Sequence, residues 1–138
     1  MAEKAEMAEK SIRIFNFHME SLLSYNWILL AAAWYGINGI LHDIFVIRQH
    51  KTGYDKDLMR LLMDGHLLIL SGILMLVSWL MVKEEVLWGF IIGSIVSLAM
   101  IVYVAMIFKF LKSFGTLIIS FIVLIICIIH LLPFLSTA

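Results

Sequence analysis

Four long apolar stretches, separated by short charged breaks, constrain this chain more than any other feature of its sequence. They cover residues 27–47, 58–82, 86–108 and 117–135. Each is close to the ~20 residues that an α-helix needs to cross the hydrocarbon core of a bilayer. Inside a membrane only helices and closed barrels satisfy all their backbone hydrogen bonds, and apolar runs of this length indicate helices. The sequence therefore predicts four transmembrane helices.

The composition places the excess apolar surface in lipid. The chain has 138 residues, of which 63% are hydrophobic and 14% are charged, whereas a soluble domain is about 45–50% apolar and about 25% charged. A fold this small leaves much of its surface exposed, so it cannot bury so many apolar side chains in its own core. We therefore expect a multi-pass membrane protein in contact with the lipid bilayer. Its zero formal net charge indicates no nucleic-acid partner.

The breaks between the apolar stretches are short, which constrains how neighbouring helices run. They read RQHKTGYDKD, KEE and KFLKSFG, and connections of this length join antiparallel neighbours. The predicted fold is all-α, a single membrane domain built as an up-down-up-down four-helix bundle. The first and third breaks and their flanks hold six Lys and Arg, against four elsewhere, which favours a topology with both termini outside.

Residues 1–24 form a different kind of segment ahead of the first apolar stretch. Glu6 and Lys10 are an i,i+4 pair in the order that stabilises a helix. One face of this helix carries an apolar stripe formed by Ile12, Phe15, Met19 and Leu22. A helix with one apolar and one polar face is typical of a segment that lies in the membrane interface. We therefore predict an amphipathic interfacial helix that leads into the first span.

Small residues recur on one face of the third span. Gly89, Gly93 and Ser97 follow one another at intervals of four residues. In lipid, packing rather than the exclusion of water drives helix association, and small residues let two backbones approach closely. We predict that these three residues form a helix-packing face. In one alternative, the same face docks on a second copy of the chain or on a larger membrane complex.

Polar side chains interrupt the first two spans near one depth. The candidate site residues are Asn38, His42, Asp43, Arg60, Asp64 and His66. His42 and His66 each lie twelve residues from Tyr54 in the intervening break, so an antiparallel hairpin places them at the same level. A charged side chain at the bilayer centre costs roughly 2.5–3.5 kcal/mol on insertion scales, so ionisable residues here indicate function. The sequence therefore predicts a ligand- or cofactor-binding pocket between the two spans.

Helical rotation of about 100° per residue divides these side chains into two groups. Asn38 and His42 share one face at i,i+4, and His66 is a possible third member of that group. Arg60 and Asp64 share another face, and we expect them to pair, with Asp43 nearby.

Several functions are compatible with these groups. The pocket can bind a small ligand, with His42 or Asp64 as acid or base. His42 and His66 can serve as the two axial ligands of a haem. The acids and histidines can relay protons or ions if the chain is a transporter that acts as an oligomer. Alternatively, the protein is a non-catalytic accessory subunit or a homo-oligomeric structural protein, whose polar side chains only hydrogen-bond across the hairpin.

The sequence contains no zinc-binding motif, and we expect no metal site. The residues indicate no particular reaction, so both enzymatic and non-enzymatic functions are compatible with the sequence.

Overall fold

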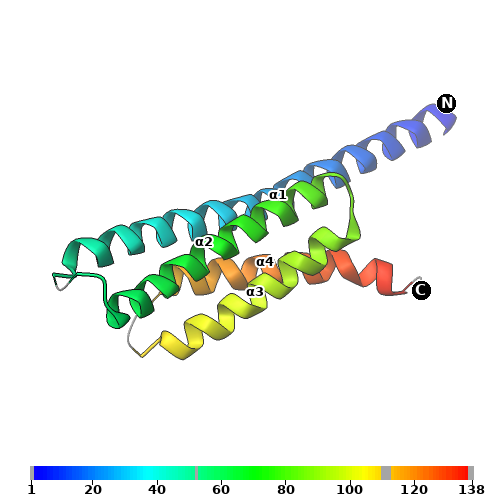
Figure 1. Ribbon diagram of the computed structural model, residues 1–138. Helices are drawn as coiled ribbons and strands as arrows, with labels where there is room; N and C mark the ends of the chain where they lie inside the picture. The colour runs from blue at the N-terminus through cyan, green and yellow to red at the C-terminus, as the bar shows by residue number, and fades with distance from the viewer. Residues whose placement is uncertain (1, 52, 110–112, 137–138) are drawn as a thin grey trace.

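The computed structural model describes the backbone of residues 2–51, 53–109 and 113–136, and the side chains of residues 25–51, 53–109 and 113–132. Within these residues there are four helices and no strand (Figure 1). The helices are α1 (Ala2–Gln49), α2 (Lys56–Lys83), α3 (Leu87–Ile107) and α4 (Phe114–Ser136). The prediction of an all-helical chain is therefore confirmed.

Each helix contains a segment that is long and apolar enough to cross a membrane. These segments are Tyr25–Gln49, Lys56–Lys83, Leu87–Ile107 and Phe114–Leu132. Their ends lie within three residues of those expected from the sequence. The apolar segments of the helices therefore coincide closely with the apolar stretches of the sequence, because hydropathy is a local property of the chain.

Acidic residues lie at both ends of α2. The Oδ1 atom of Asp55 accepts a hydrogen bond from the backbone N–H of Leu58 at 2.8 Å and so caps the start of α2. At the other end of α2, Glu85 adopts a left-handed backbone with a φ of 56°. This conformation stops a helix, so the chain turns within a few residues and α3 begins at Leu87.

The first helix is continuous from Ala2 to Gln49, and its N-terminal part projects beyond the end of α2 (Figure 1). The expected interfacial segment and the first span are therefore parts of one helix. The side chains of residues 1–24 lie outside the described side chains, so the amphipathic character of this segment stays a prediction.

The helices pack as a bundle. α1 contacts α2 and α4, and α3 contacts the same two helices. The contact between α1 and α2 is the most extensive, because glycines bring the two backbones together. A Cβ atom added to Gly39 would lie 2.6 Å from the Gly65 carbonyl oxygen, and one added to Gly72 would lie 2.8 Å from the Gly36 nitrogen. These contacts fix the level at which α1 faces α2, and hence which polar side chains meet.

The small residues of α3 lie inside the bundle. A Cβ atom on Gly89 would lie 2.9 Å from the Ser78 carbonyl oxygen on α2, and one on Gly93 would lie 2.9 Å from the Cys127 Sγ on α4. Ser97, one turn further along, is fully buried. This face therefore packs α3 against α2 and α4. The alternative in which it docks on a second subunit is wrong, because helices of the same chain already fill it.

A buried hydrogen bond ties α1 to α4. The hydroxyl groups of Tyr35 and Ser120 are 2.7 Å apart, and Ser120 donates to the Thr116 carbonyl oxygen at 2.6 Å. Because the Ser120 hydrogen is used in this way, Tyr35 is the donor to the Ser120 oxygen. Both side chains are fully buried.

The substitution Tyr35→Phe removes this bond and leaves the ring in place. We expect the free energy of unfolding to fall by about 0.5–1.5 kcal/mol, the usual net contribution of such a bond. Unfolding of the purified protein by SDS, followed by circular dichroism, measures this loss. Tyr54→Phe is the matched control, since Tyr54 is 79% exposed in the connection between α1 and α2. Equal stability of the two variants would show that the Tyr35 bond contributes nothing.

Candidate functional site

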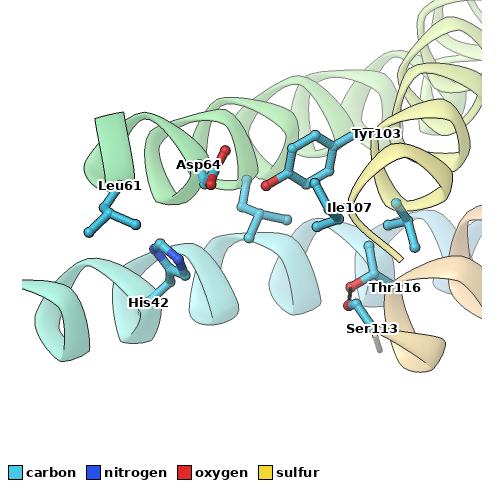
Figure 2. Close-up of a pocket in the computed structure, with 9 residues that line it drawn as sticks. His42, Leu61, Asp64, Tyr103, Ile107, Ser113 and Thr116 are labelled. Carbon is cyan, nitrogen blue, oxygen red and sulfur yellow. Dashed lines mark hydrogen bonds between the residues drawn. The ribbon is translucent and has the colours of Figure 1, made fainter. Parts of the chain in front are cut away.

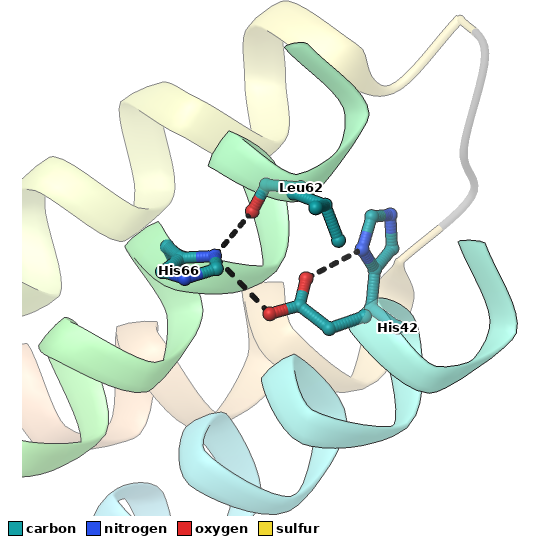
Figure 3. Close-up of polar contacts among 4 residues, drawn as sticks. His42, Leu62 and His66 are labelled. Atoms are coloured by element: carbon teal, nitrogen blue, oxygen red, sulfur yellow. Dashed lines mark hydrogen bonds and ion pairs between the residues drawn. The ribbon is translucent and has the colours of Figure 1, made fainter. Parts of the chain in front are cut away.

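Asp43 of α1 contacts two histidines that come from different helices. Its Oδ2 atom lies 3.1 Å from Nδ1 of His66 on α2, and its Oδ1 atom lies 3.7 Å from Nδ1 of His42 (Figure 3). Nδ1 of His66 is also 2.8 Å from the Leu62 carbonyl oxygen. Because both of these neighbours are acceptors, Nδ1 of His66 carries a hydrogen. The structure thus joins the first two spans through a His–Asp–His cluster.

Gly65 makes room for this carboxylate. A Cβ atom added at Gly65 would overlap the Oδ1 and Cγ atoms of Asp43. Any larger residue at this position would therefore push the carboxylate away from α2 and out of reach of His66. Because Gly65 of α2 has no side chain, the Asp43 carboxylate of α1 can lie against α2.

The cluster extends from the inside of the bundle to its outer surface. The side chain of Asp43 is 14% exposed and that of His42 is 25% exposed, whereas that of His66 is 71% exposed. Oδ1 of Asp43 and Nδ1 of His42 are both buried, and their separation is too long for a hydrogen bond. Buried polar atoms without a hydrogen-bond partner are uncommon in folded proteins, and among the described side chains Ser97 Oγ is a third such atom.

A cavity of about 320 Å³ lies at the same end of the bundle and takes its walls from all four helices and the α3–α4 connection (Figure 2). Its polar lining consists of His42, Asp64, Tyr103, Ser113 and Thr116. Its apolar lining consists of Leu61, Leu68, Val104 and Ile107. His42 belongs both to this lining and to the His–Asp–His cluster, so the two features are continuous.

Three polar interactions organise the lining of the cavity. The Tyr103 hydroxyl of α3 points toward the Asp64 carboxylate of α2 and interacts with it (Figure 2). On the other side, Thr116 Oγ1 accepts a hydrogen bond from Ser113 at 2.9 Å and another from the Trp34 indole N–H at 3.2 Å. The Trp34 ring also packs over Gly115. The start of α4 is thereby held against α1, which closes one side of the cavity.

The structure brings together some of the residues that the sequence singled out. His42, Asp43 and His66 form one cluster, and His42 and Asp64 share the cavity. Asn38 donates to the Trp34 carbonyl oxygen within α1 at 2.7 Å. It also lines a shallower hollow beside the cavity together with His42.

The expected grouping of the acidic residues differs from the structure in two respects. Asp43 contacts the histidines rather than lying beside Asp64, because Gly65 leaves space for its carboxylate. Arg60 and Asp64 line a common outer hollow, but among the described side chains no ion pair joins them. Asp64 instead faces Tyr103, which belongs to a third helix.

Tyr103, Ser113 and Thr116 line the cavity but were not predicted. The sequence did contain a signal for Tyr103: it places a hydroxyl group in an otherwise apolar span, and a hydroxyl group buried in lipid needs a hydrogen-bond partner. Ser113 and Thr116 lie in and just after the last break, where hydroxyl residues are common and carry little information.

The arrangement of the two histidines does not fit a haem. Axial ligands face one another across the iron, with the macrocycle between them. Here both Nδ1 atoms turn toward one carboxylate, which occupies the space between the rings. In addition, the α1 and α2 backbones touch at Gly39 and Gly65, which leaves no room for a macrocycle between the helices.

Within the part of the chain whose side chains are described, no group of three or more His, Cys, Asp or Glu is arranged to hold a metal ion.

The chain matches no protein-family model, no curated protein and no solved structure. The lining of the cavity supplies a carboxylate, an imidazole and three hydroxyl groups around an apolar hollow.

Proposed function

We propose that this is an integral membrane protein that binds a small amphiphilic ligand in the cavity between its helices. In this proposal the four helices cross the bilayer in alternating directions, and the N-terminal part of α1 extends into the interface. Four helices of membrane length and an exterior rich in exposed leucine and isoleucine support this placement. The cavity then lies in one leaflet, near the ends of the helices.

The observation that carries the proposal is the convergence of polar groups on an otherwise apolar cavity. Each of the four helices contributes at least one polar side chain to the lining, namely His42, Asp64, Tyr103 and Thr116. Small-molecule sites are typically apolar hollows of about 300–1,000 Å³ in which a few polar groups fix the ligand's orientation. The cavity, at about 320 Å³, accommodates a polar headgroup and the first part of an alkyl chain.

A bulky substitution at the rim tests the proposal. Leu61 lines the cavity from α2 and its side chain is 45% exposed, so Leu61→Trp adds volume there without disturbing the buried core. Leu70→Trp is the matched control, since Leu70 is 53% exposed on the same helix and does not line the cavity.

Native mass spectrometry from a mild detergent measures the outcome. We expect the unmodified protein and Leu70→Trp to retain a bound small molecule, and Leu61→Trp to lose most of it. An unmodified protein without any bound mass, or equal retention by all three proteins, contradicts the proposal.

A further inference from the structure

We propose that the ligand of this cavity carries a protonated amine, and that Asp64 binds it through an ion pair. The inference rests on the proposed function and names the chemical class of the ligand. It follows from the charges, hydrogen-bonding groups and walls of the cavity.

The cavity contains a carboxylate without a cationic partner. Asp64 is the acidic residue of its lining, and among the described residues that line it there is no lysine or arginine. Arg60, one helical turn earlier, lies on the outer side of α2 and makes no described ion pair with Asp64. Tyr103 is a polar neighbour of this carboxylate, but it brings no charge.

Asp64 is only partly exposed, so its carboxylate has lost part of its hydration, and this favours a cation as the ligand. Transferring a charge out of water is compensated only when an opposite charge and good hydrogen bonds replace the lost hydration. An anionic headgroup would be repelled by Asp64, and a neutral one would offer only a hydrogen bond. An ammonium group offers both a positive charge and three hydrogen-bond donors.

The remaining polar groups of the lining complement such a headgroup. The Tyr103 hydroxyl can donate to Asp64 and still accept a hydrogen bond from the ligand. His42 also lines the cavity, and a neutral imidazole carries one ring nitrogen that accepts a hydrogen bond. The lining therefore combines one negative charge with two further acceptors.

The walls favour an alkylamine over a small hydrophilic cation. Leu61, Leu68, Val104 and Ile107 surround the polar groups. A polyhydrated cation would lose its water against these side chains without replacement, whereas an alkyl chain gains by burial in contact with them.

Two probes of equal chain length separate charge from hydrophobicity. Dodecylamine, which is protonated at pH 7 because its pKa is close to that of lysine, is compared with dodecanol. The full-length protein is titrated with each probe in the same detergent, and the thermal unfolding midpoint is followed by circular dichroism. The unmodified protein is compared with Asp64→Asn, which keeps the side-chain shape, and with Glu84→Gln, which removes the same charge at the opposite end of α2.

We expect dodecylamine to stabilise the unmodified protein and Glu84→Gln at a concentration at least tenfold lower than dodecanol. In Asp64→Asn this preference is lost, and the two probes act at similar concentrations. A tenfold preference for the amine that survives in Asp64→Asn overturns the role of Asp64.

The outcome for Leu61→Trp distinguishes the inference from the proposed function. If both probes act equally on the unmodified protein and both are weakened by Leu61→Trp, the cavity binds amphiphiles but the amine class is wrong. If neither probe is affected by Leu61→Trp or by Asp64→Asn, the cavity is not the binding site, and both proposals fail. The comparison of amine with alcohol on the unmodified protein is informative even if Asp64→Asn does not fold.

Discussion

Gly72→Ala is expected to lower the free energy of unfolding by about 3 kcal/mol, the upper end of the usual cost of overpacking. The added Cβ atom would lie 2.8 Å from the Gly36 nitrogen and 2.9 Å from the Ala32 carbonyl oxygen. Both are backbone atoms of α1, so no side-chain rotation relieves the overlap. The two helices must move apart, which weakens the largest helix–helix contact in the bundle.

Gly36→Ala provides a control from the same contact. A Cβ atom at Gly36 meets nothing within 4 Å, although its backbone touches Gly72. Alanine also has a higher helix propensity than glycine, by about 1 kcal/mol in water. We therefore expect Gly36→Ala to be as stable as the unmodified protein or slightly more stable. Unfolding by SDS, followed by circular dichroism, compares the two variants, and equal destabilisation by both would falsify the close packing of α1 on α2.

Most of the fold could be predicted because it depends on local properties of the chain. Apolar runs of membrane length and short charged breaks are visible in the sequence, and they indicate the number of helices and the apolar segment that each contains. The coincidence in depth of His42 and His66 was equally accessible, since it requires only that two neighbouring helices run antiparallel. In the structure both histidines contact Asp43, as expected for residues at one level.

The details of the site could not be predicted, because they depend on the rotation of each helix about its own axis. Hydropathy does not specify this rotation in a chain whose helices are apolar on every side. Whether Asp43 faces His66 or Asp64 is decided by the empty space beside Gly65, a property of two packed helices. The approach of Tyr103 to Asp64 likewise requires the relative rotation of α2 and α3.

His42 and His66 lie at one depth, as predicted, but their arrangement does not fit the haem that this depth suggested. Equal depth is necessary for two axial haem ligands but not sufficient, since the rings must also be separated by a macrocycle. The glycines at positions 39 and 65 bring the two helices too close for this. Both glycines are present in the sequence, but only the structure shows that they face one another and bring the two backbones into contact.

Gly65→Ala is expected to lower the free energy of unfolding by about 3 kcal/mol through its effect on Asp43. The added Cβ atom would overlap the Asp43 carboxylate and displace it from His66. A charge that loses its partner in a region of low dielectric constant is strongly destabilising, typically by about 3–5 kcal/mol when the pair is fully buried. The Asp43 side chain is 14% exposed but its partner His66 is 71% exposed, so loss of this pair costs less than that range. The rest of the expected loss comes from the added methyl group, since overpacking typically costs about 1–3 kcal/mol.

A second substitution separates this mechanism from simple overpacking. In the double variant Asp43→Ala/Gly65→Ala the overlapping carboxylate and its charge are both absent, so the double variant should be more stable than Gly65→Ala alone. Coupling energies between contacting residues reach about 3 kcal/mol, and we expect one of at least about 1.5 kcal/mol here. Asp57→Ala in the Gly65→Ala background is the control, because Asp57 is exposed in the first turn of α2 and the substitution removes the same kind of side chain. Rescue by Asp43→Ala but not by Asp57→Ala identifies the Asp43 carboxylate as the group that requires glycine at position 65. Strictly additive losses would instead mean that the added methyl group acts on the helix backbones, and that the His–Asp–His cluster contributes little to the contact between α1 and α2.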